Sequence, residues 1–274
     1  MDDVHPIGVF DSGVGGLSVL RALQAEMPWE RFVYVADNGH APYGERDDAH
    51  VLRRSHAIAD YLIASHRIKA LVVACNTATA AAIHTLRAAY TSLPIVGIEP
   101  ALKPAAAASK TGMVGVMATR GTLNSEKFRA LLTSLHGTAT FVLQPCDGLA
   151  DAIERSDQSR IAALCQQYTH AMGPFGNAAQ AIDTLVLGCT HYAFVLDELI
   201  KCVGPAVGLL EGGAPVARHT KRLLASQAPA ADIAVVLPSK AETAFYSTGD
   251  VQLLDQAVSR WMQTTSHTQA LQVG

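Results

Sequence analysis

Hydrophobic runs and amphipathic stretches alternate regularly along the first hundred residues. Short runs of aliphatic and β-branched residues predict buried strands, and alanine-rich stretches with apolar positions at helical spacing predict helices between them. The predicted strands are 5–11, 31–37, 69–75 and 93–100, and the predicted helices are 15–27, 48–66 and 77–90. Strict alternation of strand and helix indicates parallel strands covered by helices, which is an α/β fold.

The same pattern restarts after Pro100. We predict strands at 111–119, 139–145, 182–189 and 206–213, and helices at 124–136, 191–203 and 214–226. The stretch 226–232 is rich in alanine and polar residues and predicts a loop. The tail from Ser266 is expected to be frayed.

Two motifs occur once in each half of the chain. Gly8–Gly13 aligns with Gly115–Arg120, and Leu71–Thr77 aligns with Leu185–His191. The motifs are 67 residues apart in the first half (Gly8 to Cys75) and 74 in the second (Gly115 to Cys189). We therefore expect two pseudo-symmetric, doubly wound domains, one of residues 1–98 plus 211–274 and one of 99–210. Because ligands bind at the carboxyl ends of the strands in open α/β sheets, we expect the site in the cleft between them.

Cys75 and Cys189 occupy the matched positions where a predicted strand gives way to a helix. A helix N-terminus offers free N–H groups and a positive dipole, which favour thiolate over thiol and also bind carboxylates. Thr77 and Thr190 follow and can cap these helices. We expect one thiol on each wall of the cleft, each with an anion cradle. A metal site of Cys75, Cys189 and His191 is a weaker alternative, because no further ligand stands at a recognisable spacing.

The other three cysteines have no repeated polar context. Free cysteine is commonly a small buried hydrophobe, and we interpret Cys146, Cys165 and Cys202 in this way. The odd number of cysteines and the length of the chain argue against a disulfide framework.

Several polar residues allow both a structural and a functional interpretation. Asp11 and Ser12 can cap the helix before Leu17, or Asp11 can face the cleft and orient the Cys75 thiol. The glycines after them fit neither a dinucleotide-binding nor a P-loop pattern. Pro42-Tyr43-Gly44 is explained adequately by a turn.

Three further positions stay open in the same way. Thr119 and Thr122 can donate hydroxyls or simply turn the chain into a helix. Glu154 is typical of a solvated helix residue. His191 is commonly a packed histidine, but beside Cys189 it can be an acid or base.

Composition narrows the class of protein. The 274 residues are 49% hydrophobic and 16% charged with a net charge of −3. A well-packed protein is expected, without the basic patch of a nucleic-acid partner or the roughly 20 apolar residues of a membrane span. The acidic N-terminus does not resemble a signal peptide, so we expect a soluble cytoplasmic protein.

The motifs taken together resemble the glutamate racemases, the cofactor-independent racemases of bacterial cell-wall synthesis. The similarity runs from Ile7 to about Asp250. It is carried by "GVFDSGVGGLSVL", "ADNGHAPYGER", "ACNTATA", "GIEPALKPA", "ATRGTL", "LVLGCTHY" and "FYSTGD".

The resemblance implies roles for particular residues. Cys75 would serve D-glutamate and Cys189 L-glutamate as catalytic acid and base, with Asp11, Glu154 and His191 assisting proton transfer. The substrate-binding residues would be Asp11, Ser12, Pro42, Tyr43, Gly44, Asn76, Thr77, Thr119, Thr122, Thr190 and His191. The resemblance implies no cofactor, no metal, a homodimer, and D-glutamate supplied for peptidoglycan.

Some features differ from the family pattern, and some alternative functions remain. Ala193 replaces a usual proline, Glu211 stands in an atypical segment, and the short N-terminus argues against activation by a cell-wall precursor. Aspartate or hydantoin racemisation is the nearest rival, and an arylmalonate decarboxylase-like reaction is less favoured because it keeps only one cysteine. A solute-binding protein also has two lobes around a cleft, but it needs export.

Overall fold

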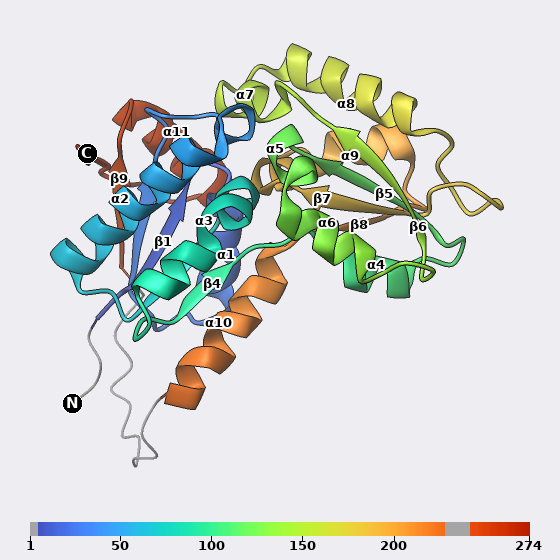
Figure 1. The fold of residues 1–274 in the computed structure, drawn as a ribbon. Coiled ribbons are helices and arrows are strands. Elements are labelled where there is room, and N and C mark those ends of the chain that lie inside the picture. The colour runs from blue at the N-terminus through green and yellow to red at the C-terminus, as the bar shows by residue number, and fades with distance from the viewer. Residues whose placement is uncertain (1–4, 228–241) are drawn as a thin grey trace.

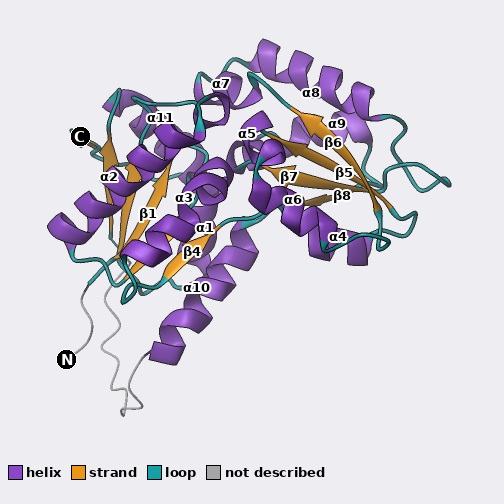
Figure 2. Ribbon diagram, in the orientation of Figure 1, coloured by secondary structure: helices purple, strands orange, loops and turns teal. Residues whose placement is uncertain are grey.

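The computed structural model describes residues 5–227 and 242–274, and most of the predicted loop at 226–232 lies outside these ranges. Two sheets, each covered by helices, form two lobes (Figures 1 and 2). Every strand pairing within the described ranges is parallel. No helix there is both long and apolar enough to cross a membrane.

The first sheet has six strands in the order β10-β9-β2-β1-β3-β4. Its strands are β1 (Ile7–Asp11), β2 (Phe32–Ala36), β3 (Ala70–Val73), β4 (Ile95–Gly97), β9 (Thr243–Ser247) and β10 (Gln269–Ala270). The core on one face is shared with α1 (Leu17–Glu26), α10 (Gly213–Gln227) and α11 (Val251–Met262), and that on the other with α2 (Asp48–His66) and α3 (Asn76–Ala89).

Strand β1 shows why these sequences form buried parallel strands. All five of its residues are buried. Side chains alternate along a strand, so Ile7 and Val9 pack in the α1 core while Phe10 packs in the α2–α3 core. A strand covered on both faces needs apolar residues at successive positions, which is the pattern of this sequence.

The second sheet has four strands in the order β6-β5-β7-β8. They are β5 (Met113–Ala118), β6 (Thr140–Pro145), β7 (Thr184–Gly188) and β8 (Gly208–Leu210). One face packs on α7 (Leu149–Glu154), α8 (Gln158–Met172) and α9 (Leu196–Val203), and the other on α4 (Leu102–Ala108) and α6 (Glu126–Thr133); α5 (Arg120–Asn124) follows β5.

The two sheets repeat one topology. The order β2-β1-β3-β4 in the first sheet corresponds to β6-β5-β7-β8 in the second. The aligned glycine motifs begin on β1 and β5, and the aligned cysteine motifs begin on β3 and β7. The predicted fold class is confirmed. Because the sheets take their strands from separate ranges, we propose 1–98 plus 211–274 as domain 1 and 99–210 as domain 2.

Two local predictions are wrong. The tail from Ser266 is ordered, because β10 pairs with β9 and the Leu271 N–H donates to the Ser247 carbonyl at 2.7 Å. The open edge of the sheet supplies these backbone partners, and Leu271 is buried. The predicted helix at 191–203 is split into a 3₁₀ turn, η2 (Thr190–Phe194), and α9. This turn lets Tyr192 and Val195 both enter the domain 2 core.

Candidate active site

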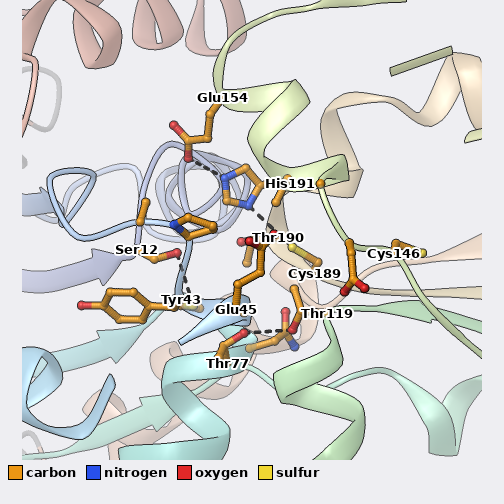
Figure 3. A pocket seen from close by; sticks show the side chains of 18 residues that line it. Ser12, Tyr43, Glu45, Thr77, Thr119, Cys146, Glu154, Cys189, Thr190 and His191 are labelled. Atoms are coloured by element: carbon orange, nitrogen blue, oxygen red, sulfur yellow. Dashed lines mark hydrogen bonds and ion pairs between the residues drawn. The ribbon is translucent and has the colours of Figure 1, made fainter. Parts of the chain in front are cut away.

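A pocket lies between the two domains at the carboxyl ends of six strands (Figure 3). Its lining comes from the segments that follow β1, β2 and β3 in domain 1 and β5, β6 and β7 in domain 2. The lining residues are Ser12, Ala41, Pro42, Tyr43, Gly44, Glu45, Cys75, Asn76, Thr77, Thr119, Cys146, Asp147, Gly148, Ala150, Glu154, Cys189, Thr190 and His191.

Cys75 is placed on the domain 1 wall by the start of α3. It is the N-cap residue, and its sulfur accepts the Ala78 N–H at 3.4 Å. Its thiol donates to the Ser12 hydroxyl at 3.7 Å. The predicted capping by Thr77 is wrong, because the sulfur itself takes that role and leaves the Thr77 hydroxyl free to bond elsewhere.

The pKa of the Cys75 thiol is raised, and not lowered as its place at a helix N-terminus suggests. Burial raises the pKa of this thiol well above its ordinary value, and the nearby Asp11 carboxylate raises it further. The Ala78 N–H and the Ser12 hydroxyl lower the pKa, but by less. The effect of burial on the pKa is therefore larger than the opposite effect of the helix N-terminus, and the neutral thiol form of Cys75 is favoured.

Cys189 has different neighbours on the domain 2 wall. Its sulfur lies 3.6 Å from Nδ1 of His191, and Nε2 of His191 lies 2.6 Å from Oε1 of Glu154 (Figure 3). Burial alone would lower the pKa of His191, but the hydrogen bonds with Cys189 and Glu154 raise it well above its ordinary value. A charged imidazolium beside the sulfur stabilises a thiolate.

Glu154 is not the solvated helix residue that its sequence context suggests. Its side chain is 15% exposed and sits at the pocket wall. Oε1 accepts from His191 and also from the backbone N–H of Val14 in domain 1, at 2.7 Å. Glu154 therefore orients the imidazole and connects the two domains.

The glycine-rich loop after β1 packs against domain 2. A Cβ atom on Gly13 would lie 1.9 Å from Oε1 of Glu154, and one on Gly15 would lie 2.4 Å from Nδ1 of His191. These glycines are needed because a side chain would displace the catalytic-site residues. The loop serves this close approach and does not cap α1, whose N-cap residue is Gly16 without a side-chain cap.

Asp11 and Thr190 form another contact between the domains. The Thr190 hydroxyl donates to Oδ2 of Asp11 at 3.1 Å, and the Ser18 hydroxyl donates to the Thr190 carbonyl at 3.1 Å. Thr190 thus bonds across the interface, and the prediction that it caps a helix is wrong. Asp11 is fully buried behind Ser12, whose N–H and hydroxyl both bond to it.

Three threonine hydroxyls meet at another side of the pocket. Thr77 Oγ1 lies 3.0 Å from Thr119 Oγ1, and the Thr119 hydroxyl donates to Thr122 Oγ1 at 3.0 Å. Thr119 also caps α5. The 3₁₀ turn η1 (Tyr43–Glu45) approaches so closely that a Cβ on Gly44 would lie 2.7 Å from Thr119.

The structure brings together every predicted site residue. Asp11 and Thr122 lie behind the lining and bond to residues in it, and the others line the pocket. Six further residues line the pocket and were not predicted from the sequence: Ala41, Glu45, Cys146, Asp147, Gly148 and Ala150. The segment 146–150 follows a predicted strand, so its position at the carboxyl edge is the signal that could have found it. Within 5–227 and 242–274, no group of three or more His, Cys, Asp or Glu residues is arranged to hold a metal ion.

Comparisons with known proteins agree with this geometry. The family model of Asp/Glu/Hydantoin racemases matches residues 15–220. A glutamate racemase of Ectopseudomonas mendocina is 47% identical over 92% of both chains. The structure of glutamate racemase RacE1 from Bacillus anthracis has a TM-score of 0.82 at 29% identity, covering 98% of this chain and 97% of that one. Escherichia coli glutamate racemase, solved with L-glutamate and the activator UDP-MurNAc-Ala, also scores 0.82, at 28% identity and 98% and 99% coverage. This chain belongs to the Asp/Glu/Hydantoin racemase family.

Proposed function

We propose that this protein interconverts L- and D-glutamate without a cofactor, by proton transfer between two cysteines. The observation that carries the proposal is the placement of Cys75 and Cys189 in one pocket, each on the wall of a different domain. Inverting an α-carbon requires a proton to leave one face and another to arrive at the opposite face. Two bases on opposite walls do this without moving.

The surroundings of the two sulfurs support a resting state ready for L-glutamate. Cys189, beside the His191 imidazolium, is the base that removes the α-proton. Cys75, kept neutral by burial and by Asp11, is the thiol that protonates the other face of the carbanion. After one turnover the proton sits on Cys189 and Cys75 is the thiolate, which is the state that reacts with D-glutamate.

The pocket offers polar groups that fit an amino acid. Oδ1 of Asn76 is buried and has no hydrogen-bond partner within the described ranges, so it suits the substrate ammonium. The hydroxyls of Thr77 and Thr119 and the N–H groups at the start of α3 suit carboxylates. Carboxylate oxygens held in this way are stabilised as the carbanion forms, and contact between the domains keeps water out.

The biological setting is part of the same proposal. The relatives named above are bacterial glutamate racemases, and we infer a cytoplasmic homodimer that supplies D-glutamate for peptidoglycan. Aspartate or hydantoin racemisation remains the alternative within the family, and the names of the most similar relatives favour glutamate.

The decisive experiment follows the circular dichroism of L-glutamate with purified protein and no added cofactor. We expect the signal to decay to zero, and in heavy water we expect deuterium mainly in the newly formed enantiomer. L-aspartate is the matched control. Tight binding of glutamate with an unchanged signal would instead identify a binding protein, and early deuterium in the starting enantiomer would indicate a single base.

A further inference from the structure

A buried ion pair lies behind the pocket and outside its lining. Asp37 follows β2 at the carboxyl end of the sheet and is fully buried, and Arg54 on α2 is 7% exposed. Nε and Nη2 of Arg54 donate to Oδ2 and Oδ1 of Asp37 at 3.0 and 2.9 Å. Such a fork holds both groups in one orientation, which a lysine could not do.

Asp37 connects this pair to the pocket. The Tyr43 hydroxyl donates to Oδ2 of Asp37 at 2.5 Å, and the Thr248 hydroxyl donates to Oδ1 at 2.7 Å. Tyr43 is 1% exposed and begins the turn η1, which lines the pocket. The carboxylate of Asp37 therefore accepts four hydrogen bonds. One of them, from Tyr43, anchors the 41–45 loop that lines the pocket.

Arg54 connects the same pair to the end of the described chain. Its Nη1 donates to the oxygens of Val273 and Gly274 at 3.0 and 3.2 Å. The pairing of β10 with β9 and the burial of Leu271 keep these acceptors in place. A continuous path of hydrogen bonds therefore runs from residues 269–274 through Arg54 and Asp37 to Tyr43.

Stability alone does not explain a buried charged pair. Desolvation of the two ions offsets most of their attraction, and apolar replacements of similar volume are often equally stable. A bidentate pair does supply a fixed orientation, and here the group that receives it is the side chain of Tyr43, in the middle of the 41–45 loop.

We propose that Asp37 and Arg54 are positioning residues that hold the 41–45 loop in its substrate-binding place, and that the 269–274 segment completes this support. The proposal rests on the racemase function proposed above. Neither residue lines the pocket, so both act through Tyr43.

The test compares Arg54→Met with Arg53→Met, the same substitution at the exposed neighbouring position of α2. We expect Arg54→Met to raise KM for both enantiomers about tenfold, with a smaller fall in kcat, because a displaced loop weakens binding. Arg54→Lys should not restore KM. Since the equilibrium constant of a racemisation is one, kcat/KM must fall equally in both directions, which checks the measurement.

Two milder variants cover the case in which Arg54→Met does not fold. Tyr43→Phe removes only the hydroxyl, and deletion of residues 273–274 removes the outer acceptors of Arg54 together with the partly buried Val273 side chain. Each should raise KM about tenfold, the lower end of the effect of a hydrogen bond to a charged group. An unchanged KM in both folded variants would overturn the proposal, as would a fall in kcat alone, which indicates partial unfolding. An inactive wild type and an inactive Arg53→Met protein would instead contradict the racemase function.

Discussion

The two walls of the pocket have the same architecture and different chemistry. Cys75 and Cys189 each follow the third strand of the repeated topology. Cys75 caps a regular helix and is surrounded by Ser12 and Asp11, whereas Cys189 precedes a 3₁₀ turn without capping it and faces His191. The repeated fold therefore determines where each sulfur lies, and the unrepeated neighbours give the two sulfurs different electrostatic surroundings.

This difference gives the enzyme a defined starting state. Two identical cysteine environments would hold the proton equally often on either side. Burial and the carboxylate of Asp11 raise the pKa of Cys75, whereas Cys189 lies beside the imidazole of His191, so we propose that the two sulfurs begin the reaction in different roles. Substitutions of these neighbouring residues should therefore affect the proton transfer at Cys75 and the proton transfer at Cys189 unequally.

Removal of either sulfur should have the largest effect, and it tests whether both walls of the pocket take part in catalysis. Cys75→Ser and Cys189→Ser should each slow racemisation by about 10²- to 10⁴-fold, the usual contribution of an acid or base. In heavy water Cys75→Ser should still exchange the α-proton of L-glutamate, and Cys189→Ser that of D-glutamate. Proton NMR of each enantiomer measures both. Normal turnover in either variant would refute the two-base mechanism, and the buried Cys165→Ser is the control.

Weakening the hydrogen bonds beside each sulfur should affect proton removal from L-glutamate and from D-glutamate differently. Glu154→Gln removes a charged hydrogen bond from His191 and should lower kcat/KM roughly ten- to a hundredfold. Proton removal by Cys189 then limits the rate, so the primary isotope effect should rise with α-deuterated L-glutamate and fall with the D-enantiomer.

Ser12→Ala is the matched change on the other wall. The bond to Cys75 is neutral and long, so we expect a loss of roughly two- to tenfold. The isotope effect should here rise with D-glutamate. The same pattern in both variants would mean that the neighbours do not act on separate sulfurs.

The neutral state of Cys75 predicts a pH dependence of stability. Burial raises the pKa of this thiol above the ordinary value of 9.0. Below pH 9 the folded and unfolded chains both keep the proton; above it only the unfolded chain loses it, so the free energy of unfolding falls. In Cys75→Ser this fall should be less steep, by a difference that grows from about 0.7 kcal/mol per pH unit at pH 9 towards about 1.4 above pH 10. Urea unfolding measures it, and parallel curves for the two proteins would contradict the assignment.

An aromatic contact supports the turn η2, which directly follows Cys189. Removing this contact should have the smallest effect. Phe194 of η2 stacks on Trp261 of α11, with ring centroids 4.6 Å apart and planes at 13°, and it packs on the cores of both domains. Trp261→Leu should lower the free energy of unfolding by about 0.5–1.5 kcal/mol. It should also shift the isotope effects in the direction expected for Glu154→Gln. Trp29→Leu, at a 41% exposed site, is the control and should leave the isotope effects unchanged.

Most of the fold was predictable because it depends on local patterning. Apolar runs such as Ile7–Phe10 predict strands covered on both faces, and the repeated motifs predict the repeated topology. The tail was mispredicted because the partners of β10 are backbone groups on an edge strand more than 20 residues away in sequence. Such partners leave no local signal.

The residues of the site could be predicted from the sequence, but the contacts between them could not. Thr77 and Thr190 follow cysteines at helix starts, and local rules assign them as caps. Both instead bond across the domain interface, to Thr119 and to Asp11. Asp37 could be placed at a strand end, but its ion pair with Arg54 depends on how α2 packs over the sheet.

The sequence by itself determined the α/β architecture, the two matched cysteines and the family, because strand and helix periodicity and motif spacing are local properties of the chain. Only the tertiary structure decided the electrostatic surroundings of those cysteines. They depend on burial and on charges contributed by distant segments: Asp11 reaches Cys75 through packing, and Glu154 in the same way reaches the histidine beside Cys189. The same motif at two walls of one pocket therefore has different neighbours, which is the basis for the proposal that one sulfur acts as an acid and the other as a base.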